Sequence, residues 1–250
     1  MRFLCCCSAA VVLTACGGAH HQAAVKDPFA YDTSAPLGVH DGGVYASSSW
    51  ATIRIISFAG VDGSRVPAYV VVPRASGRHP AVLFLHGSGG TRRDLIFEAA
   101  LLAKRGAVTM TISQPNDVLT YRPLIVNARR ALDVLDARSD VDPKRIGVVG
   151  FSLGAQTAAI LVGDDPRPKD AGIIGGRGTD VALYWIRRTH ADLFFQAGTH
   201  DAVVPHAQLV ALEQAAPGHP RVRWYDAPHA VTAPIRRDQL AWQAAELGLR

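Results

Sequence analysis

The segment from Ile146 to Gly154 constrains the fold more than any other part of this 250-residue chain. Its sequence, Ile-Gly-Val-Val-Gly-Phe-Ser-Leu-Gly, predicts a buried strand that runs through Gly-x-Ser-x-Gly into a helix. A serine at the tip of so sharp a turn takes a strained backbone conformation, and flanking glycines let strand and helix approach. We therefore expect Ser152 to be presented as a nucleophile at the carboxyl end of a strand. The alternative is an ordinary strand-to-helix turn.

Short apolar runs alternate with helical patterns on both sides of this segment. Strands are expected at 81–85, 108–112, 146–150, 171–174, 192–196 and 221–225, and helices at 93–104, 123–138, 153–162, 206–215 and 234–247. This alternation is typical of a mostly parallel sheet with helices on both faces. Two more β-rich runs, 52–58 and 67–72, flank a Gly-Val-Asp-Gly-Ser turn and predict an antiparallel pair at a sheet edge. The predicted fold is thus α/β with eight strands.

The domain itself is expected to span residues 50–250. This length, together with the 48% hydrophobic residues of the chain, suits a single hydrophobic core. Only sixteen residues, 175–190, separate two of the strands, so no large cap domain is expected. Residues 16–49 are rich in small and polar types without periodicity and predict a flexible tether. His20 and His21 within it lack further ligands at metal-binding spacing, so a solvated linker is favoured over a metal site. We expect neither a metal nor a cofactor.

The N-terminus has the composition of a targeting leader. Arg2 precedes thirteen apolar residues, Phe3 to Ala15, which are too few for a membrane span of about 20 residues. Leu-Thr-Ala-Cys at 13–16 resembles the lipobox of bacterial lipoproteins. That resemblance implies a signal peptide over 1–15, lipidation of Cys16, and a protein anchored in a membrane of the bacterial cell envelope. All four cysteines lie within residues 5–16, which excludes disulfides, a thiolate nucleophile and Cys-ligated metals from the domain.

The serine turn and its surroundings resemble the α/β-hydrolase superfamily over residues 50–248. Two short segments are similar to segments of the dienelactone-hydrolase-like and prolyl-oligopeptidase-like esterases. They are Asp-Pro-Lys-Arg-Ile at 142–146 and Val-Pro-Ala-Tyr at 66–69. The resemblance implies the α/β-hydrolase fold. One departure matters, because dienelactone hydrolases use a cysteine nucleophile where this chain has Ser152, so their substrate cannot be carried over.

A serine nucleophile needs a histidine base and a carboxylate that orients the base, and this fold supplies them in the order Ser, acid, His. Asp201 lies in Gly-Thr-His-Asp-Ala-Val-Val-Pro, which is similar to the acid loop of the family. Asp226 and Asp192 remain as alternatives, although they are placed more like strand-end or capping residues.

The expected base is His229, because it follows the last strand, where a loop can fold back over the strand ends. His200, beside the expected acid, is the main alternative, and a structural role is favoured for His86. In the family, the turn that contains His86 supplies one N–H of the oxyanion hole. Ser88 is therefore the expected first donor, and Leu153, at a helix N-terminus, the second. A phosphate-binding loop is disfavoured because the turn lacks a Gly-Lys-Ser/Thr ending.

These residues predict hydrolysis of small carboxylic esters through an acyl-enzyme, by a monomer. Acyl transfer and peptide hydrolysis would use the same groups, and a non-catalytic envelope-binding lipoprotein is the alternative of a different class. A net charge of +5 without basic and aromatic residues interleaved does not suggest a nucleic-acid partner. The sequence does not decide whether residues 114–117, Tyr184 and Trp185 face the substrate or have ordinary turn or packing roles.

Overall fold

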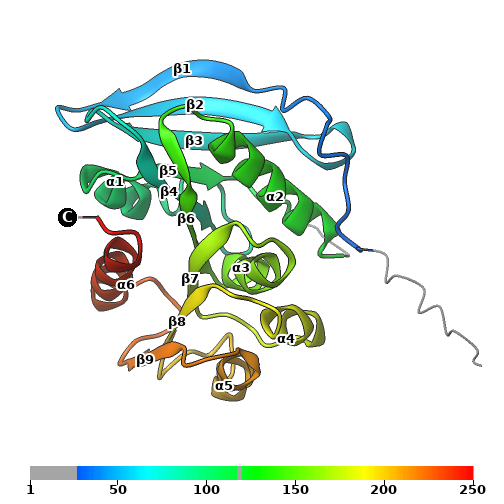
Figure 1. Cartoon of the computed structure of the whole chain (residues 1–250). Coiled ribbons are helices and arrows are strands. Elements are labelled where there is room, and N and C mark those ends of the chain that lie inside the picture. Colours follow the sequence, from blue (N-terminus) through cyan, green and yellow to red (C-terminus); the bar gives the residue numbers. More distant parts are fainter. Residues whose placement is uncertain (1–26, 117–119, 250) are drawn as a thin grey trace, which may run out of the picture.

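The computed structural model of the chain describes residues 27–116 and 120–249 and shows a single sheet between two layers of helices (Figure 1). The strands lie in the order β1-β2-β3-β5-β4-β6-β7-β8-β9. They are β1 (His40–Ser47), β2 (Ala51–Ala59), β3 (Arg65–Pro73), β4 (His79–Leu85), β5 (Val108–Ile112), β6 (Val141–Phe151), β7 (Pro168–Ile174), β8 (Asp192–Gly198) and β9 (Arg221–Tyr225).

Helices cover both faces of this sheet. In Figure 1, α2, α3, α4 and α5 lie on one face, while α1 and α6 lie on the other. Their bounds are α1 (Ile96–Lys104), α2 (Arg122–Asp136), α3 (Leu153–Asp164), α4 (Asp180–Ile186), α5 (His206–Ala215) and α6 (Ala233–Glu246). Each layer closes its own apolar core against the sheet. The predicted α/β class and the two helical layers are therefore confirmed.

Six adjacent strands, from β5 across to β9, are parallel, whereas β1, β2 and β3 pair antiparallel. The predicted pair β2 and β3 is antiparallel as expected, but it does not form the edge. A ninth strand, β1, lies outside it, so the count of eight strands was too low. Because β1 is almost wholly exposed and contains two glycines, it carries no apolar alternation that a sequence pattern could reveal.

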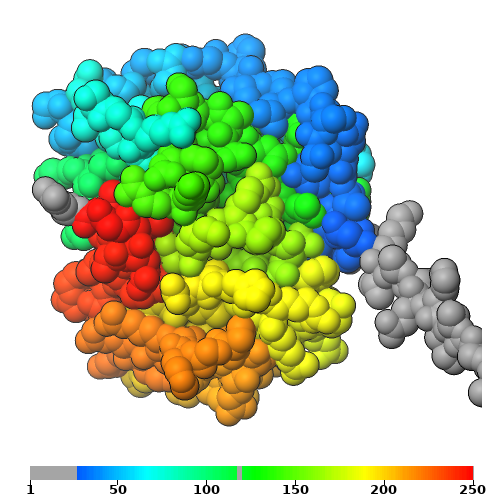
Figure 2. All heavy atoms as spheres, in the orientation of Figure 1, coloured from blue at the N-terminus to red at the C-terminus, as the bar shows by residue number. Residues whose placement is uncertain are grey.

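The prediction of a flexible tether is wrong for residues 27–49. Beyond β1, residues 27–37, here called the strap, lie on the α2 face, where the blue spheres of Figure 2 rest against the body. Phe29 is only 4% exposed and packs 5.5 Å from the Trp185 ring. Arg130 of α2 donates hydrogen bonds to the carbonyls of Ala35 and Pro36. The rest of the predicted tether and leader, including Cys16, lies outside the described residues.

The region expected to lack a cap contains only the short helix α4, which the sequence patterns did not predict. Thr179 caps it by accepting a hydrogen bond from the Ala182 N–H. No helix within the described ranges is both long and apolar enough to cross a membrane. Since the central strands are parallel, the loops that follow them converge on one edge of the sheet, and that edge positions the site.

Candidate active site

Ser152 occupies the turn between β6 and α3 in a conformation that is unusual for a side-chain-bearing residue. Its φ is 55° and its ψ is −115°, a strain of about 1–3 kcal/mol that persists only where the surroundings enforce it. The Ser152 N–H donates to the carbonyl of Ile174 at 2.9 Å. A Cβ on Gly154 would overlap the carbonyl oxygen of Leu85, and one on Gly150 would overlap that of Gly154. The two glycines are therefore required by close packing of strand, turn and helix.

Asp201 and His229 form a partly buried pair at the same edge of the sheet. His229 Nδ1 lies 2.6 Å from Asp201 Oδ2, and the Asp201 side chain is only 2% exposed. The Val203 and Val204 N–H groups both donate to the other carboxylate oxygen at 2.8 Å. Burial raises the pKa of Asp201, but these N–H groups and His229 outweigh it and hold the pKa below its ordinary value. An ionised Asp201 keeps the proton of His229 on Nδ1 and leaves Nε2 free to accept another.

The His229 ring lies beside the serine turn. Its centroid is 4.9 Å from that of Phe151, the residue before Ser152. A Cβ on Gly175 would lie 3.0 Å from His229 Cε1, and Gly175 directly follows the Ile174 carbonyl that binds Ser152. His229 Nε2 is buried without a hydrogen-bond partner in the described part of the chain, and no Ser152–His229 hydrogen bond is formed there. The imidazole thus has an acceptor nitrogen available next to the nucleophile turn.

The alternative acids and bases are placed less favourably. His200 Nε2 pairs with Asp226 Oδ1 at 2.8 Å, and both side chains are exposed. Asp192 is the first residue of β8 and so lies at the opposite, amino edge of the sheet. Both ring nitrogens of His86 are occupied, Nδ1 by the Gly87 carbonyl at 2.6 Å and Nε2 by the Gln114 N–H at 2.8 Å. These contacts fix His86 as a neutral structural residue.

The turn of residues 86–90, here called the oxyanion turn, lies against Ser152. A Cβ on Gly87 would come within 3.2 Å of Ser152 Cβ, and Ser88 is the next residue. The Ser88 N–H has no acceptor among the residues that the structure describes. Leu153 is the first residue of α3, so its N–H has no partner within the helix. Ser88 thus follows a residue that lies against Ser152, and Leu153 follows Ser152 itself.

Two polar residues that follow β5 hold the oxyanion turn in place. The Gln114 side-chain amide donates to the His86 carbonyl at 2.8 Å, while Asn116 Oδ1 accepts from the Gly89 N–H at 3.0 Å. The sequence left this stretch open between a substrate-facing role and a turn role, and the structure shows these two residues supporting the turn. Asp117 lies outside the described residues.

A space lined by Asp201 and His229 is too small to hold a water molecule. The larger groove lined by Tyr184 and Trp185 has none of Ser152, Asp201 and His229 in its wall. These two aromatic residues pack instead against each other and, through Trp185, against Phe29. Within the described residues, no cluster of three His, Cys, Asp or Glu side chains is arranged to hold a metal ion.

The family model described as "Dienelactone hydrolase family" matches residues 116–250, more than half of the chain. The chain belongs to the dienelactone hydrolase family. The matched range contains Ser152, Asp201 and His229, and it confirms the predicted resemblance to dienelactone hydrolases. Membership places the chain in a hydrolase family without specifying its substrate.

Curated relatives match only in part. The chain is 30% identical over 131 residues to 2,6-dihydropseudooxynicotine hydrolase of Paenarthrobacter nicotinovorans, covering 50% of this chain and 35% of that protein. It is 30% identical over 106 residues to esterase EstD of Thermotoga maritima, covering 36% of this chain and 25% of that protein. The chain thus spans about a third or less of the length of these curated relatives.

Solved structures resemble the chain over most of its length. The acetyl xylan esterase from Paenibacillus sp. R4 superposes with a TM-score of 0.72 at 18% identity, covering 84% of this chain and 89% of that one. A cold-adapted esterase from an Arctic intertidal metagenomic library reaches a TM-score of 0.74 at 18% identity, covering 82% and 98%. At this identity the likeness establishes the fold alone.

Proposed function

We propose that the protein is a serine hydrolase that cleaves carboxylic esters through a covalent acyl-enzyme. The observation that carries the proposal is the partly buried Asp201–His229 pair, 2.6 Å apart, at the edge where Ser152 is held at a positive φ. In this mechanism Ser152 Oγ attacks the ester carbonyl while His229 Nε2 accepts the hydroxyl proton. The same nitrogen then returns the proton to the departing alcohol.

The negative charge that develops on the carbonyl oxygen falls between the N–H groups of Ser88 and Leu153. Each such donor typically stabilises the transition state by about 3 kcal/mol. Water then attacks the acyl-enzyme, with His229 again accepting the proton and releasing Ser152. Asp201 stays ionised throughout and keeps the imidazole in the required tautomer.

Acyl transfer to an alcohol is the second candidate, because it shares the acyl-enzyme and differs only in the final acceptor. It is supported by 26% identity over 125 residues to a probable alcohol acetyltransferase of Cyberlindnera jadinii. Peptide hydrolysis would use the same residues, and a panel of short and long acyl esters, acetylated sugars, peptides and acceptor alcohols separates these activities.

A fluorophosphonate probe tests the mechanism directly. The purified protein is expected to be labelled and to turn over p-nitrophenyl acetate, whereas Ser152→Ala loses both. Ser34→Ala, an exposed serine of the strap, serves as the matched control and keeps both. Labelling that persists in Ser152→Ala would eliminate this serine as the nucleophile. A wild type with neither labelling nor turnover would favour the non-catalytic, envelope-binding alternative.

We further propose that the protein is a lipoprotein of the bacterial cell envelope, anchored through Cys16. The support is the lipobox-like sequence at 13–16 behind an uncharged apolar stretch. Radiolabelled palmitate should enter the wild type but not Cys16→Ala, and the variant should leave the membrane fraction. A wild type that takes up no label would disprove the anchor without affecting the proposed catalysis.

A further inference from the structure

A groove of about 1030 Å³ lies on the α2 face of the sheet, and none of the proposed catalytic residues lines it. Its walls come from three parts of the chain that are distant in sequence: the beginning of the strap, the start of α2 and the helix α4. Asp164, at the end of α3, also lines it. The groove is therefore assembled only by the tertiary fold, and nothing in the proposed ester hydrolysis uses it.

Aromatic side chains form much of the groove wall. Tyr184 is 44% exposed and meets Trp185 edge to face, with ring centroids 5.3 Å apart. Phe29 of the strap supports Trp185 from behind, and Tyr121 contributes from the start of α2. Such walls bind apolar bodies, and a free ring face also attracts cations. One face of the Tyr184 ring already carries a guanidinium, because Arg188 Cζ lies 3.6 Å from the ring centroid.

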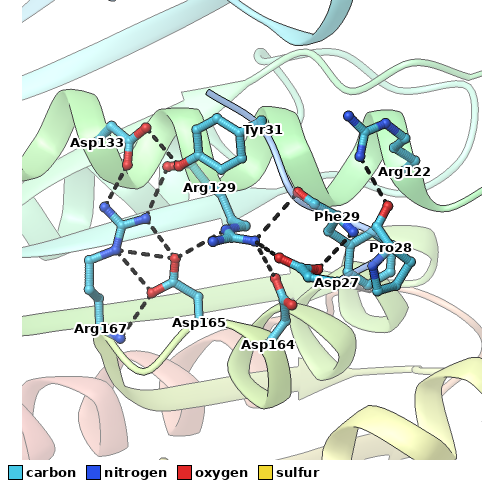
Figure 3. Close-up of polar contacts among 10 residues, drawn as sticks. All are labelled: Asp27, Pro28, Phe29, Tyr31, Arg122, Arg129, Asp133, Asp164, Asp165 and Arg167. Carbon is cyan, nitrogen blue, oxygen red and sulfur yellow. Dashed lines mark hydrogen bonds and ion pairs between the residues drawn. The ribbon is translucent and has the colours of Figure 1, made fainter. Parts of the chain in front are cut away.

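An ion-pair cluster beside the groove holds one more carboxylate than it holds guanidinium groups. Figure 3 shows Arg129 between Asp27 and Asp164, which it contacts at 3.2 and 3.1 Å, with Asp165 next to it at 3.6 Å. Arg167 pairs with Asp165 and with Asp133. The ion-pair cluster as a whole holds four carboxylates against three guanidinium groups: Asp27, Asp133, Asp164 and Asp165, and Arg129, Arg130 and Arg167.

Asp164 belongs to this cluster, and its side chain is only 4% exposed. Burial raises the pKa of Asp164 to about 6, Arg129 opposes the rise, and the neighbouring carboxylates of Asp27 and Asp165 add to it. A carboxylate in this state gains from any additional positive charge placed next to it, because its own guanidinium partner is shared with two other acids.

The remaining charged lining strengthens the same preference. Asp180, the first residue of α4, adds a third carboxylate and has no side-chain hydrogen bond to the described residues. Arg122 is the one guanidinium of the lining, and its Nη1 donates to the Pro28 carbonyl at 3.0 Å, so its charge is directed at the strap. The carboxylates of the described residues are not grouped closely enough to form a metal site.

We propose that this groove is a binding site for an organic cation with an apolar or aromatic body. The cationic group lies at Asp164, and the body lies against Tyr184 and Trp185. The proposal combines an aromatic wall that accepts the body with a buried carboxylate that shares its guanidinium partner with two other acids. It does not depend on the proposed ester hydrolysis, so failure of one leaves the other standing.

Benzyltrimethylammonium is a suitable probe, and benzyl alcohol is its uncharged comparison. Isothermal titration of the full chain at pH 8 should show saturable binding of the cation, with the alcohol at least about tenfold weaker. Binding of the cation should weaken at pH 5, where Asp164 is protonated. The groups that face Asp164 are Arg129 from α2, Asp27 from the strap and Asp165 after α3.

Two variants locate the site. Asp164→Asn keeps the side-chain shape, removes the charge and should weaken the cation about tenfold at pH 8 while abolishing the pH dependence. Tyr184→Ala removes an exposed ring, so it tests the wall without threatening the core. Asp41→Asn, an exposed carboxylate on β1, is the control and should bind as the wild type does.

Several results would overturn the proposal. They are the absence of binding to the wild type, equal affinity for benzyl alcohol, unchanged affinity in Asp164→Asn, and displacement of the probe by millimolar magnesium. Equal affinity would indicate a merely apolar groove, and displacement by magnesium would indicate a site for simple ions. Thermal melting of each variant distinguishes a lost site from a lost fold.

Discussion

Replacing Gln114 by alanine should slow catalysis more than it impairs substrate binding. Gln114 is 4% exposed, and its side-chain amide donates to the His86 carbonyl at 2.8 Å. Its backbone N–H separately donates to His86 Nε2 at 2.8 Å, and alanine retains that bond. The substitution thus removes one of the two links between Gln114 and the oxyanion turn, and it leaves a buried carbonyl without its donor.

The magnitude follows from these contacts. A buried carbonyl left unpaired costs about 1–3 kcal/mol, so the free energy of unfolding should fall by about 2 kcal/mol. Complete loss of one oxyanion donor lowers kcat by about 10²- to 10³-fold. Because Asn116 still binds the Gly89 N–H at 3.0 Å, the turn should be loosened rather than released. We expect kcat to fall by about tenfold, equivalent to about 1.4 kcal/mol, with KM nearly unchanged.

The assay is steady-state hydrolysis of p-nitrophenyl acetate, with active sites counted by fluorophosphonate labelling. Thr109→Val is the matched control, because Thr109 is fully buried and its hydroxyl donates to the Ala99 carbonyl at 3.0 Å, between β5 and α1. It should lose comparable stability and keep kcat. If Gln114→Ala loses stability with kcat unchanged, as the control does, then the side chain does not position the oxyanion turn and the reasoning fails.

Three further predictions follow from other parts of the fold. The pKa of Asp164 in the folded protein, about 6, lies above its ordinary value of 3.8, so the unfolded chain releases this proton first. The free energy of unfolding should therefore fall as pH rises from about 4 through 6, and urea titrations of Asp164→Asn should lack that slope. Phe29→Ala should destabilise the protein by about 3 kcal/mol in the same assay, since the ring is buried; a loss near zero would mean that the strap adds nothing to stability. Gly154→Ala should abolish probe labelling, because the new Cβ overlaps the Leu85 carbonyl; retained labelling would show that the turn tolerates the shift.

Much of the central sheet could be predicted from local pattern. Leu124, Leu132 and Leu135 of α2 fall at helical spacing, and each is fully buried as that spacing indicates. The strand before Ser152 and the helix after it follow from an apolar run, two glycines and a second apolar run. These signals work because burial of one face imposes a period on neighbouring residues, and the period is visible without knowledge of the partner.

The oxyanion turn shows where local pattern stopped being informative. Gln114 and His86 are 28 positions apart, and only the parallel pairing of β4 with β5 brings the ends of these strands together. Polar residues after a strand suggested some role at the sheet edge, but their spacing could not tell a ligand contact from a structural one. The direction of the side-chain amide, toward the His86 carbonyl, is a property of the tertiary structure.

By itself, the sequence determined the parallel α/β sheet, the strained serine turn and the order of the residues proposed for catalysis, because each leaves a short-range pattern of apolar residues, glycines or motif letters. Only the tertiary structure decided that the strap packs on α2, that β1 joins the sheet, and that Asp27 and Asp164 share Arg129. These contacts join residues as much as 102 positions apart, as between Asp27 and Arg129. Their free energy depends on surfaces that exist only after the core has formed, so no local period records them.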